Sequence, residues 1–272
     1  MMLSNVSLVA FYYKSYGTFL ILKKPYNSTV ELPTTEIIEL IKNKKGEADA
    51  KRGAIFNKLS REIFVAAKAG DGDPSMNARL RMVLDKARAA NMPKDNINRA
   101  IKKATDVGDT TNYDEITYEG YGPGGVAILV HTLTDNKKRT DANMHTIFTR
   151  NGGNMGSTGS VAYMFDRKGY IVIDRENWDL DEDSMLELIL DAGAEDLKTL
   201  DEAFEVFTEP KEFPAVKEAL QAQNLEFAQA QLSMIPQNYV SLDAEQADIL
   251  ETLVDKLEDD DDVQDVYTNM AD

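Results

Sequence analysis

Residues 170–234 decide the fold class, and they read YIVIDRENWDLDEDSMLELILDAGAEDLKTLDEAFEVFTEPKEFPAVKEALQAQNLEFAQAQLSM. Short β-rich runs alternate here with runs that have the apolar spacing of amphipathic helices. The sequence therefore predicts a ferredoxin-like α+β unit, whose order is β-α-β-β-α-β. The predicted elements are strand 170–174, helix 182–192, strand 196–199, strand 203–208, helix 211–222 and strand 226–234.

The segment before this unit contains further strands and one helix. Ile116 and Tyr118 alternate with polar residues, Gly122–Gly125 predicts a turn, and residues 126–134 form a β-rich run. A helix carrying Met144 is expected to end at the glycines that follow Asn151. Three local details are also predicted: a helix cap at Thr140-Asp141, a strand at Ser160–Phe165 and a turn at Arg167–Gly169.

The segment after the unit supplies what the first segment lacks. Residues 243–257 have the spacing of an amphipathic helix, and Val263–Tyr267 that of a strand. Residues 115–165 need a second helix and a final strand to complete the same β-α-β-β-α-β order. We therefore expect 241–269 to return to this first sheet, so that 170–235 is inserted in a discontinuous domain.

The block from Lys42 to Lys103 is opposite in charge to the rest of the chain. It has sixteen Lys and Arg against seven Asp and Glu, a net charge of +9, whereas the whole chain has −17 and the remainder −26. Gly70–Pro74 and Asn91–Pro93 divide it into three stretches, each predicted to be a short amphipathic helix. The apolar seams are Ile55, Leu59, Ile63, Ala66 and Ala67; Leu80, Val83, Leu84 and Ala87; and Ile97, Ala100, Ile101 and Ala104.

Packing of these seams against one another would leave most of the basic side chains in water. Lys and Arg also solvate ordinary helix faces, but such faces mix both signs, so the excess favours nucleic-acid phosphates as the partner. The block contains no zinc-finger, RNA-recognition or helix-turn-helix pattern, and charge alone does not separate DNA from RNA. The candidate nucleic-acid-binding residues are Lys42, Lys44, Lys45, Lys51, Arg52, Lys58, Arg61, Arg79, Arg81, Lys86, Arg88, Lys94, Arg99, Lys102 and Lys103.

Composition limits the remaining possibilities. A chain of 272 residues with 43% hydrophobic residues suggests about two or three domains, and the absence of cysteine excludes disulfides and cysteine-ligated metals. Leu3–Leu22 is interrupted by polar residues and fits neither a membrane span nor a signal or transit peptide. The predicted organisation is a poorly packed extension 1–40, a basic helical domain 41–108, a discontinuous α+β domain 113–168 plus 239–272, and an inserted ferredoxin-like domain 169–238.

Five stretches of the chain carry recognisable motifs. They are KKGEADAKRGAIF at 44–56, NMPKDNINRAIKK at 91–103, YEGYGPGGV at 118–126, TDNKKRT at 134–140 and NGGNMGSTGSVAYMF at 151–165. With them the chain resembles the YebC/PmpR family over nearly all of Ile41 to Tyr267. The resemblance implies a three-domain cytoplasmic protein, helical first and α+β afterwards, of a kind labelled DNA-binding transcriptional regulators.

The resemblance also implies an alternative function. The family is similar to mitochondrial translational activators of cytochrome oxidase, so a ribosome-associated translation factor with RNA contacts stays open. A third alternative, which does not come from the resemblance, is an acidic protein-interaction module whose basic domain binds an anionic protein partner. Family members usually begin with Gly-His-Ser-Lys-Trp ahead of Ile-Lys-His-Lys-Lys. Here Ile41–Lys45 reads IKNKK and follows TEIIEL at 35–40, so contacts of that opening segment in relatives are not carried over.

No enzyme, cofactor, metal or membrane partner is predicted. His131 and His145 have no neighbouring Cys and no HExxH spacing, so packing or surface roles are expected. Glu258–Asp262 lacks the spacing of a calcium loop and is interpreted as a solvated connection. A glycine-rich stretch predicts a flexible or tightly turned loop, with the alternative that it lets RNA or peptide approach closely. Its glycines are Gly152, Gly153, Gly156 and Gly159.

Overall fold

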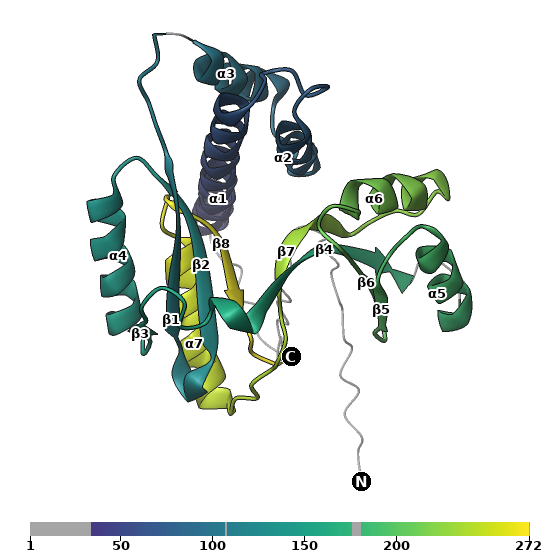
Figure 1. The fold of residues 1–272 in the computed structure, drawn as a ribbon. Coiled ribbons are helices and arrows are strands. Elements are labelled where there is room, and N and C mark those ends of the chain that lie inside the picture. Colours follow the sequence, from purple (N-terminus) through teal and green to yellow (C-terminus); the bar gives the residue numbers. More distant parts are fainter. Residues whose placement is uncertain (1–33, 107, 176–180, 272) are drawn as a thin grey trace. The chain divides into compact units, whose positions relative to one another are not determined.

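The helical part comes first in the chain. The computed structural model describes residues 34–106, 108–175 and 181–271, with side chains described from Lys51 onward, and Ala50–Asp272 is one compact unit. The helices are α1 Thr34–Ala69, α2 Ala78–Ala89 and α3 Lys94–Thr105 (Figure 1). The chain is thus helical from Thr34, within the predicted extension 1–40, and residues 1–33 of that extension lie outside the described residues.

The predicted apolar seams pack together as one cluster in the helical part. The cluster contains Ile63 of α1, Leu80 of α2 and Ile97 of α3, all buried. Asn77 fixes the connection between the first two helices: its side chain accepts a hydrogen bond from the Leu80 N–H (3.0 Å) and donates one to the Ala66 carbonyl (2.8 Å). This N-cap satisfies a free N–H at the start of α2 and holds α2 against the end of α1.

Sheet A contains the strands on both sides of the inserted unit. Its order is β3-β1-β2-β8, and all its pairings are antiparallel. Helices α4 and α7 cover one face, where Phe148 and Leu253 pack against Ile128 and Val130 (Figure 1). The elements are β1 Asp114–Tyr121, β2 Ala127–Thr134, α4 Lys137–Arg150, β3 Asn154–Met155, α7 Ala244–Glu258 and β8 Val263–Thr268.

Sheet B is the ferredoxin-like unit predicted from residues 170–234. Its order β5-β6-β4-β7 is that of a ferredoxin-like sheet, and α5 and α6 bury Ile189 and Leu220 against Ile171 and Phe204. This confirms the predicted fold class. The elements are β4 Phe165–Asp174, α5 Glu182–Asp191, β5 Asp196–Thr199, β6 Ala203–Thr208, α6 Phe213–Ala222 and β7 Gln229–Pro236.

The return of the C-terminal segment to sheet A is also confirmed, because β8 pairs with β2 from Ile128 to Thr132. Sheet A has the same spatial strand order as sheet B, but its chain order differs from the predicted one. Along the chain, the domain runs β1-β2-α4-β3 and then, after the inserted unit, α7-β8. The strand at the position of β1 in the sheet comes third along the chain in a ferredoxin-like unit, whereas here it comes first. The chain thus contains one ferredoxin-like sheet and one sheet with the same spatial strand order, in which the third strand has moved to the start of the domain.

Three local predictions are wrong. The helix α4 starts at Lys137, and Asn136 rather than Thr140-Asp141 caps it, accepting from the Arg139 N–H (3.2 Å). Instead of the strand predicted at 160–165, residues 160–164 form a loop with a 3-10 turn, η2 Ala162–Met164, and the strand β4 begins only at Phe165.

The third wrong prediction is the turn at Arg167–Gly169, because these residues lie in the interior of β4. A Cβ at Gly169 would lie 2.2 Å from Thr208 Oγ1 and 2.6 Å from a ring carbon of Phe213, so glycine is needed there for packing.

Candidate nucleic-acid interface

The first group of predicted basic residues contacts the protein itself. Lys58 Nζ donates to the Glu258 carbonyl (2.6 Å), and the Arg61 guanidinium donates to the Asp261 carbonyl (2.6 Å) and to Asp262 Oδ1 (2.7 Å). Burial lowers the pKa of Lys58 despite the opposing charges of nearby carboxylates. These contacts join α1 to the connection between α7 and β8.

Asp262 is the centre of this junction. It is 2% exposed, and its carboxylate also accepts hydrogen bonds from Arg139 (2.7 Å) and Thr140 (2.9 Å). Burial by itself would raise the pKa of Asp262, but the hydrogen bonds from Arg139, Thr140 and Arg61 hold it below its usual value. The prediction of a solvated connection at 258–262 is therefore wrong for Asp262. Nothing in the sequence distinguishes it from Asp259, Asp260 and Asp261.

Lys86 of α2 makes a second ionic junction. Its Nζ lies 3.0 Å from Glu62 Oε1 and 3.5 Å from Asp265 Oδ1 of β8. Burial alone would lower the pKa of Lys86, yet the charges of Asp265 and Glu62 raise it. We call Lys58, Arg61 and Lys86 the anchoring cations, because each is partly buried against an acidic or carbonyl oxygen of the fold.

The second group lies on α3. Lys94, Arg99 and Lys102 are exposed, and among the described residues no hydrogen bond or ion pair involves them. Arg99, Lys102 and Lys103 follow i, i+3, i+4 spacing and so share one side of the helix. Lys103 is less free, since its Nζ is 4.0 Å from Asp109 and 5.6 Å from the centre of the Phe64 ring. We call Lys94, Arg99 and Lys102 the surface cations.

The remaining candidates lie between these two extremes. Arg79 pairs with Glu115 (2.5 Å), Arg88 pairs with Asp85 (3.0 Å), and Arg81 donates to the Pro74 and Ser75 carbonyls (3.2 Å each). All three stay exposed, as do Lys51 and Arg52. The backbone of Lys42, Lys44 and Lys45 lies in α1, and their side chains lie outside the described residues.

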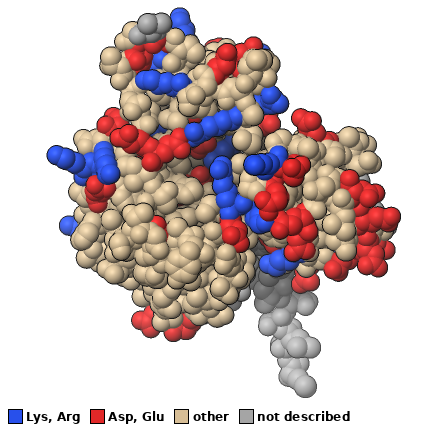
Figure 2. Space-filling view, in the orientation of Figure 1, with Lys and Arg blue, Asp and Glu red and all other residues tan. Residues whose placement is uncertain are grey.

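Acidic side chains gather elsewhere in the unit. Figure 2 shows mainly Asp and Glu over α5 and the adjoining part of sheet B, whereas Lys and Arg lie around the middle of the same face next to further Asp and Glu. The first turn of α5 contains Glu182 and Asp183 and follows Asp181, and each of the three is exposed. The sign segregation seen along the sequence is thus partly kept on the surface.

The glycine-rich stretch is a tightly turned loop fastened to β1. Gly152 and Gly159 have φ values of +81° and +85°, a region that favours glycine. The buried carboxylate of Glu119 accepts backbone hydrogen bonds from Gly159 (2.6 Å), Val161 (2.7 Å) and Ala162 (2.8 Å). Burial opposes the charge of Glu119, but these bonds lower its pKa. Gly153 donates to the Phe148 carbonyl (2.9 Å) and Gly156 to that of Glu119 (2.8 Å), which closes the turn.

The histidines have the environments expected from the sequence. His131 is partly buried in β2 with its ring against Tyr267, and His145 is exposed on α4. Within the described part of the chain no three His, Cys, Asp or Glu side chains are arranged to hold a metal ion. Nor does any described helix have the length and apolar character needed to cross a membrane.

The helical part and the two sheets define a class of α+β protein in which one ferredoxin-like sheet interrupts another. The chain belongs to the TACO1/YebC family: the model of the family's N-terminal domain matches residues 38–107, and the model of its second and third domains matches residues 113–270. This confirms the family suggested by the sequence motifs.

Relatives and a solved structure agree with this assignment. A probable transcriptional regulatory protein of Enterococcus faecalis is 59% identical over 229 residues, which cover 84% of this chain and 95% of that protein. One of Lactobacillus gasseri is 60% identical over 232 residues, covering 85% and 95%. The crystal structure of a conserved hypothetical protein from Aquifex aeolicus matches with a TM-score of 0.73 and 41% identity, covering 82% of this chain and 91% of that one.

Proposed function

We propose that this chain is a cytoplasmic DNA-binding transcriptional regulator that contacts phosphates with the exposed cations of its helical part. The observation that carries the proposal is α3, where Lys94, Arg99 and Lys102 are exposed and have no ionic or hydrogen-bonding partner among the described residues. The names of the relatives in Enterococcus and Lactobacillus, probable transcriptional regulatory proteins, support the regulatory role.

The proposed mechanism is electrostatic. Lys and Arg that neutralise phosphates release the counterions condensed on nucleic acid, which supplies affinity without reading the sequence. The net charge of −26 outside the basic block disfavours contact of the remaining surface with the same polyanion, so the helical part is the side that binds. No residue is assigned a catalytic role, and no cofactor takes part.

A salt titration tests this proposal with variants matched in charge. For duplex DNA the logarithm of the affinity should fall by about 0.9 per contacted phosphate for each unit in the logarithm of the salt concentration. Replacing Lys94, Arg99 and Lys102 by Gln should reduce that slope by about 3 and weaken binding, with Tm unchanged. The control replaces Lys137, Lys138 and Arg150 of α4, three exposed basic residues, by Gln. A flat salt response, or equal losses in both variants, would refute the proposal.

The same cations would also fit ribosomal RNA, the alternative that the family resemblance implies. Co-sedimentation with ribosomes, together with crosslinking to cellular DNA and RNA, separates the two mechanisms. Recovery of DNA supports the transcriptional proposal. Recovery of ribosomal RNA alone, abolished by the α3 variant, would replace it with a translational role.

A further inference from the structure

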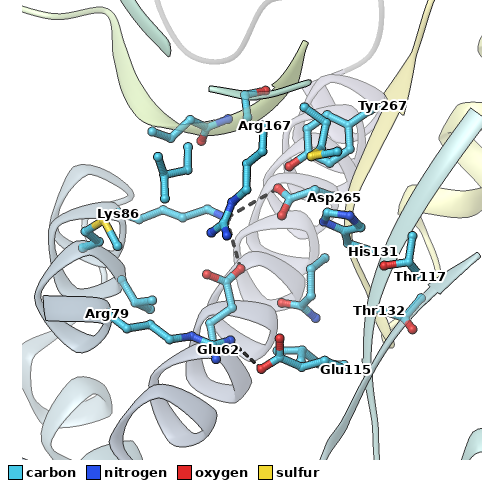
Figure 3. A pocket seen from close by; sticks show the side chains of 18 of the residues that line it. Glu62, Arg79, Lys86, Glu115, Thr117, His131, Thr132, Arg167, Asp265 and Tyr267 are labelled. Carbon is cyan, nitrogen blue, oxygen red and sulfur yellow. Dashed lines mark hydrogen bonds and ion pairs between the residues drawn. The ribbon is translucent and has the colours of Figure 1, made fainter. Parts of the chain in front are cut away.

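A solvent-accessible cleft of about 530 Å³ lies within the compact unit, away from the surface cations. Its walls come from α1 and α2, from the face of sheet A that α4 and α7 leave uncovered, and from β7 of sheet B (Figure 3). A volume of this size is typical of sites for small ligands, and such sites occur preferentially between domains.

The wall formed by sheet A offers two rings and unused hydrogen-bonding groups. His131 of β2 and Tyr267 of β8 lie edge to face with ring centres 5.2 Å apart, and Thr117 stands opposite His131 on β1. Neither ring's polar atoms make a hydrogen bond to another described residue. Burial lowers the pKa of His131 and raises that of Tyr267, so at neutral pH the imidazole has one donor and one acceptor and the phenol keeps its proton.

The opposite walls combine apolar side chains with charged and polar ones. Met82 and Val83 of α2 face the cleft from one side, and Leu232 and Met234 of β7 from another. A planar ring entering the cleft would therefore meet apolar and sulfur-containing side chains on one side and the two rings on the other. Bases in single strands are commonly held in this way, on aromatic or histidine side chains and with hydrogen bonds to their edges.

Four cations and four carboxylates lie in or beside the cleft, so its net charge is balanced, but one cation has no direct ion-pair partner among the described residues. Arg79 pairs with Glu115, Lys86 with Glu62 and Asp265, and Lys217 with Asp85 (3.0 Å). Arg167 of β4 also lines the cleft, and no ion pair or hydrogen bond to any described residue involves its guanidinium (Figure 3). Figure 3 shows Arg167 in the same cleft as His131 and Tyr267, with the Asp265 carboxylate also near the two rings.

We propose that the cleft binds one unpaired nucleotide of a single-stranded nucleic acid, with its base against His131 and Tyr267 and its phosphodiester on Arg167. The Arg167 guanidinium makes no direct ion pair with a described residue, so its planar fork is available to two phosphate oxygens of a phosphodiester. A base stacked and paired in a duplex cannot enter a cleft of this kind without leaving its partner. This inference rests on the proposed function and assigns to one site a role beyond the phosphate contacts of α3.

Photo-crosslinking tests the position of the nucleotide. The probes are a short single-stranded RNA with 4-thiouridine, the matching DNA with 4-thiothymidine, and each strand annealed to its complement. We expect crosslinked peptides containing Tyr267, His131 or Met234 from a single strand and none of them from the duplex. Crosslinks confined to the helical part would overturn the inference and leave the proposed function standing. No binding by any probe at low salt would overturn both.

A charge-matched pair of variants tests the role of Arg167. Arg167→Gln should weaken single-strand binding about tenfold and lower the salt slope by about 0.7, with Tm unchanged because the guanidinium has no described protein partner. Arg150→Gln removes the same charge from α4, which covers the other face of sheet A, and should change neither quantity. Equal effects of the two variants, or an unchanged crosslink yield in Arg167→Gln, would show that the cleft holds no nucleotide.

Discussion

Arg61 and Arg99 belong to the same basic block, yet the fold uses their charges differently. Arg61 donates to Asp262 and to the Asp261 carbonyl, and its side chain is 23% exposed. Arg99 is exposed on α3 and makes no hydrogen bond or ion pair within the described residues. The positive block is thus divided between cations that hold the helical part to sheet A and cations that stay available to a ligand.

The physical basis of this division is the position of the acidic run 258–262. It lies about 200 residues after α1 in the sequence, but β8 brings it to the first helix, where Lys58 and Arg61 meet it. Charges that look segregated along the chain therefore pair in the folded unit. Buried or half-buried pairs of this kind specify an arrangement, whereas exposed cations contribute little to stability and much to association.

Asp262→Ala is the strongest test of the difference between the cations that pair within the fold and those exposed on α3. It leaves Arg61 and Arg139 without their shared carboxylate and removes one hydrogen bond of the buried Thr140 hydroxyl. We expect the free energy of unfolding to fall by about 3 kcal/mol, as is typical when one partner of a buried ion pair is removed. Urea unfolding followed by circular dichroism measures this loss.

The neighbouring residue provides the control. Asp261 is exposed and contacts Arg61 through its backbone carbonyl, so Asp261→Ala removes an acidic side chain from the same run and keeps that hydrogen bond. Its free energy of unfolding should stay within about 0.5 kcal/mol of the original. Equal losses in the two variants would mean that the junction depends on the general acidity of the run and not on the buried carboxylate.

Asp262 also shows where sequence-based prediction stops. The seams of α1, α2 and α3 repeat within a few residues, so their periodicity alone predicts the helical core. The burial of Asp262 depends on Arg139 and Arg61, which are 123 and 201 residues away. No local pattern encodes such a distant environment, and a run of five acidic residues normally indicates solvent exposure.

The two sheets also show which features local sequence can predict and which it cannot. The return of β8 to sheet A is predictable because the first segment lacks elements that the last segment contains. Gly169 is misleading because a glycine after Arg167 and Lys168 has the composition of a turn. Glycine is needed at this position because Thr208 and Phe213 approach it closely in the folded protein, and neither residue lies near it in the sequence.

A paired exchange of single arginines sharpens the comparison. Arg61→Gln should lower the free energy of unfolding by about 1.5 kcal/mol, because it removes charge-assisted hydrogen bonds to Asp262 and the Asp261 carbonyl. Arg99→Gln should leave stability unchanged and reduce the salt slope of DNA binding by about 1. Denaturation gives the free energy of unfolding of each variant, and fluorescence anisotropy at several salt concentrations gives the salt slope of its DNA binding. If Arg61→Gln weakened binding more than Arg99→Gln at equal folded fraction, the division of the block would be wrong.

Acid titration is the mildest perturbation of the junction. The pKa of Asp262 lies below its usual value in the folded protein, so its ionised form contributes stability that is present above the unfolded value of about 3.9 and is lost as the pH falls through the folded pKa. Asp262→Asn has no such titration, so its free energy of unfolding should fall less steeply than that of the original protein below about pH 4. The surface cations make no described pair with a carboxylate, so replacing Lys94, Arg99 and Lys102 by Gln should leave the acid limb of the stability curve parallel to the original. Equal slopes for Asp262→Asn and the original protein would show that the carboxylate gains nothing from Arg61 and Arg139.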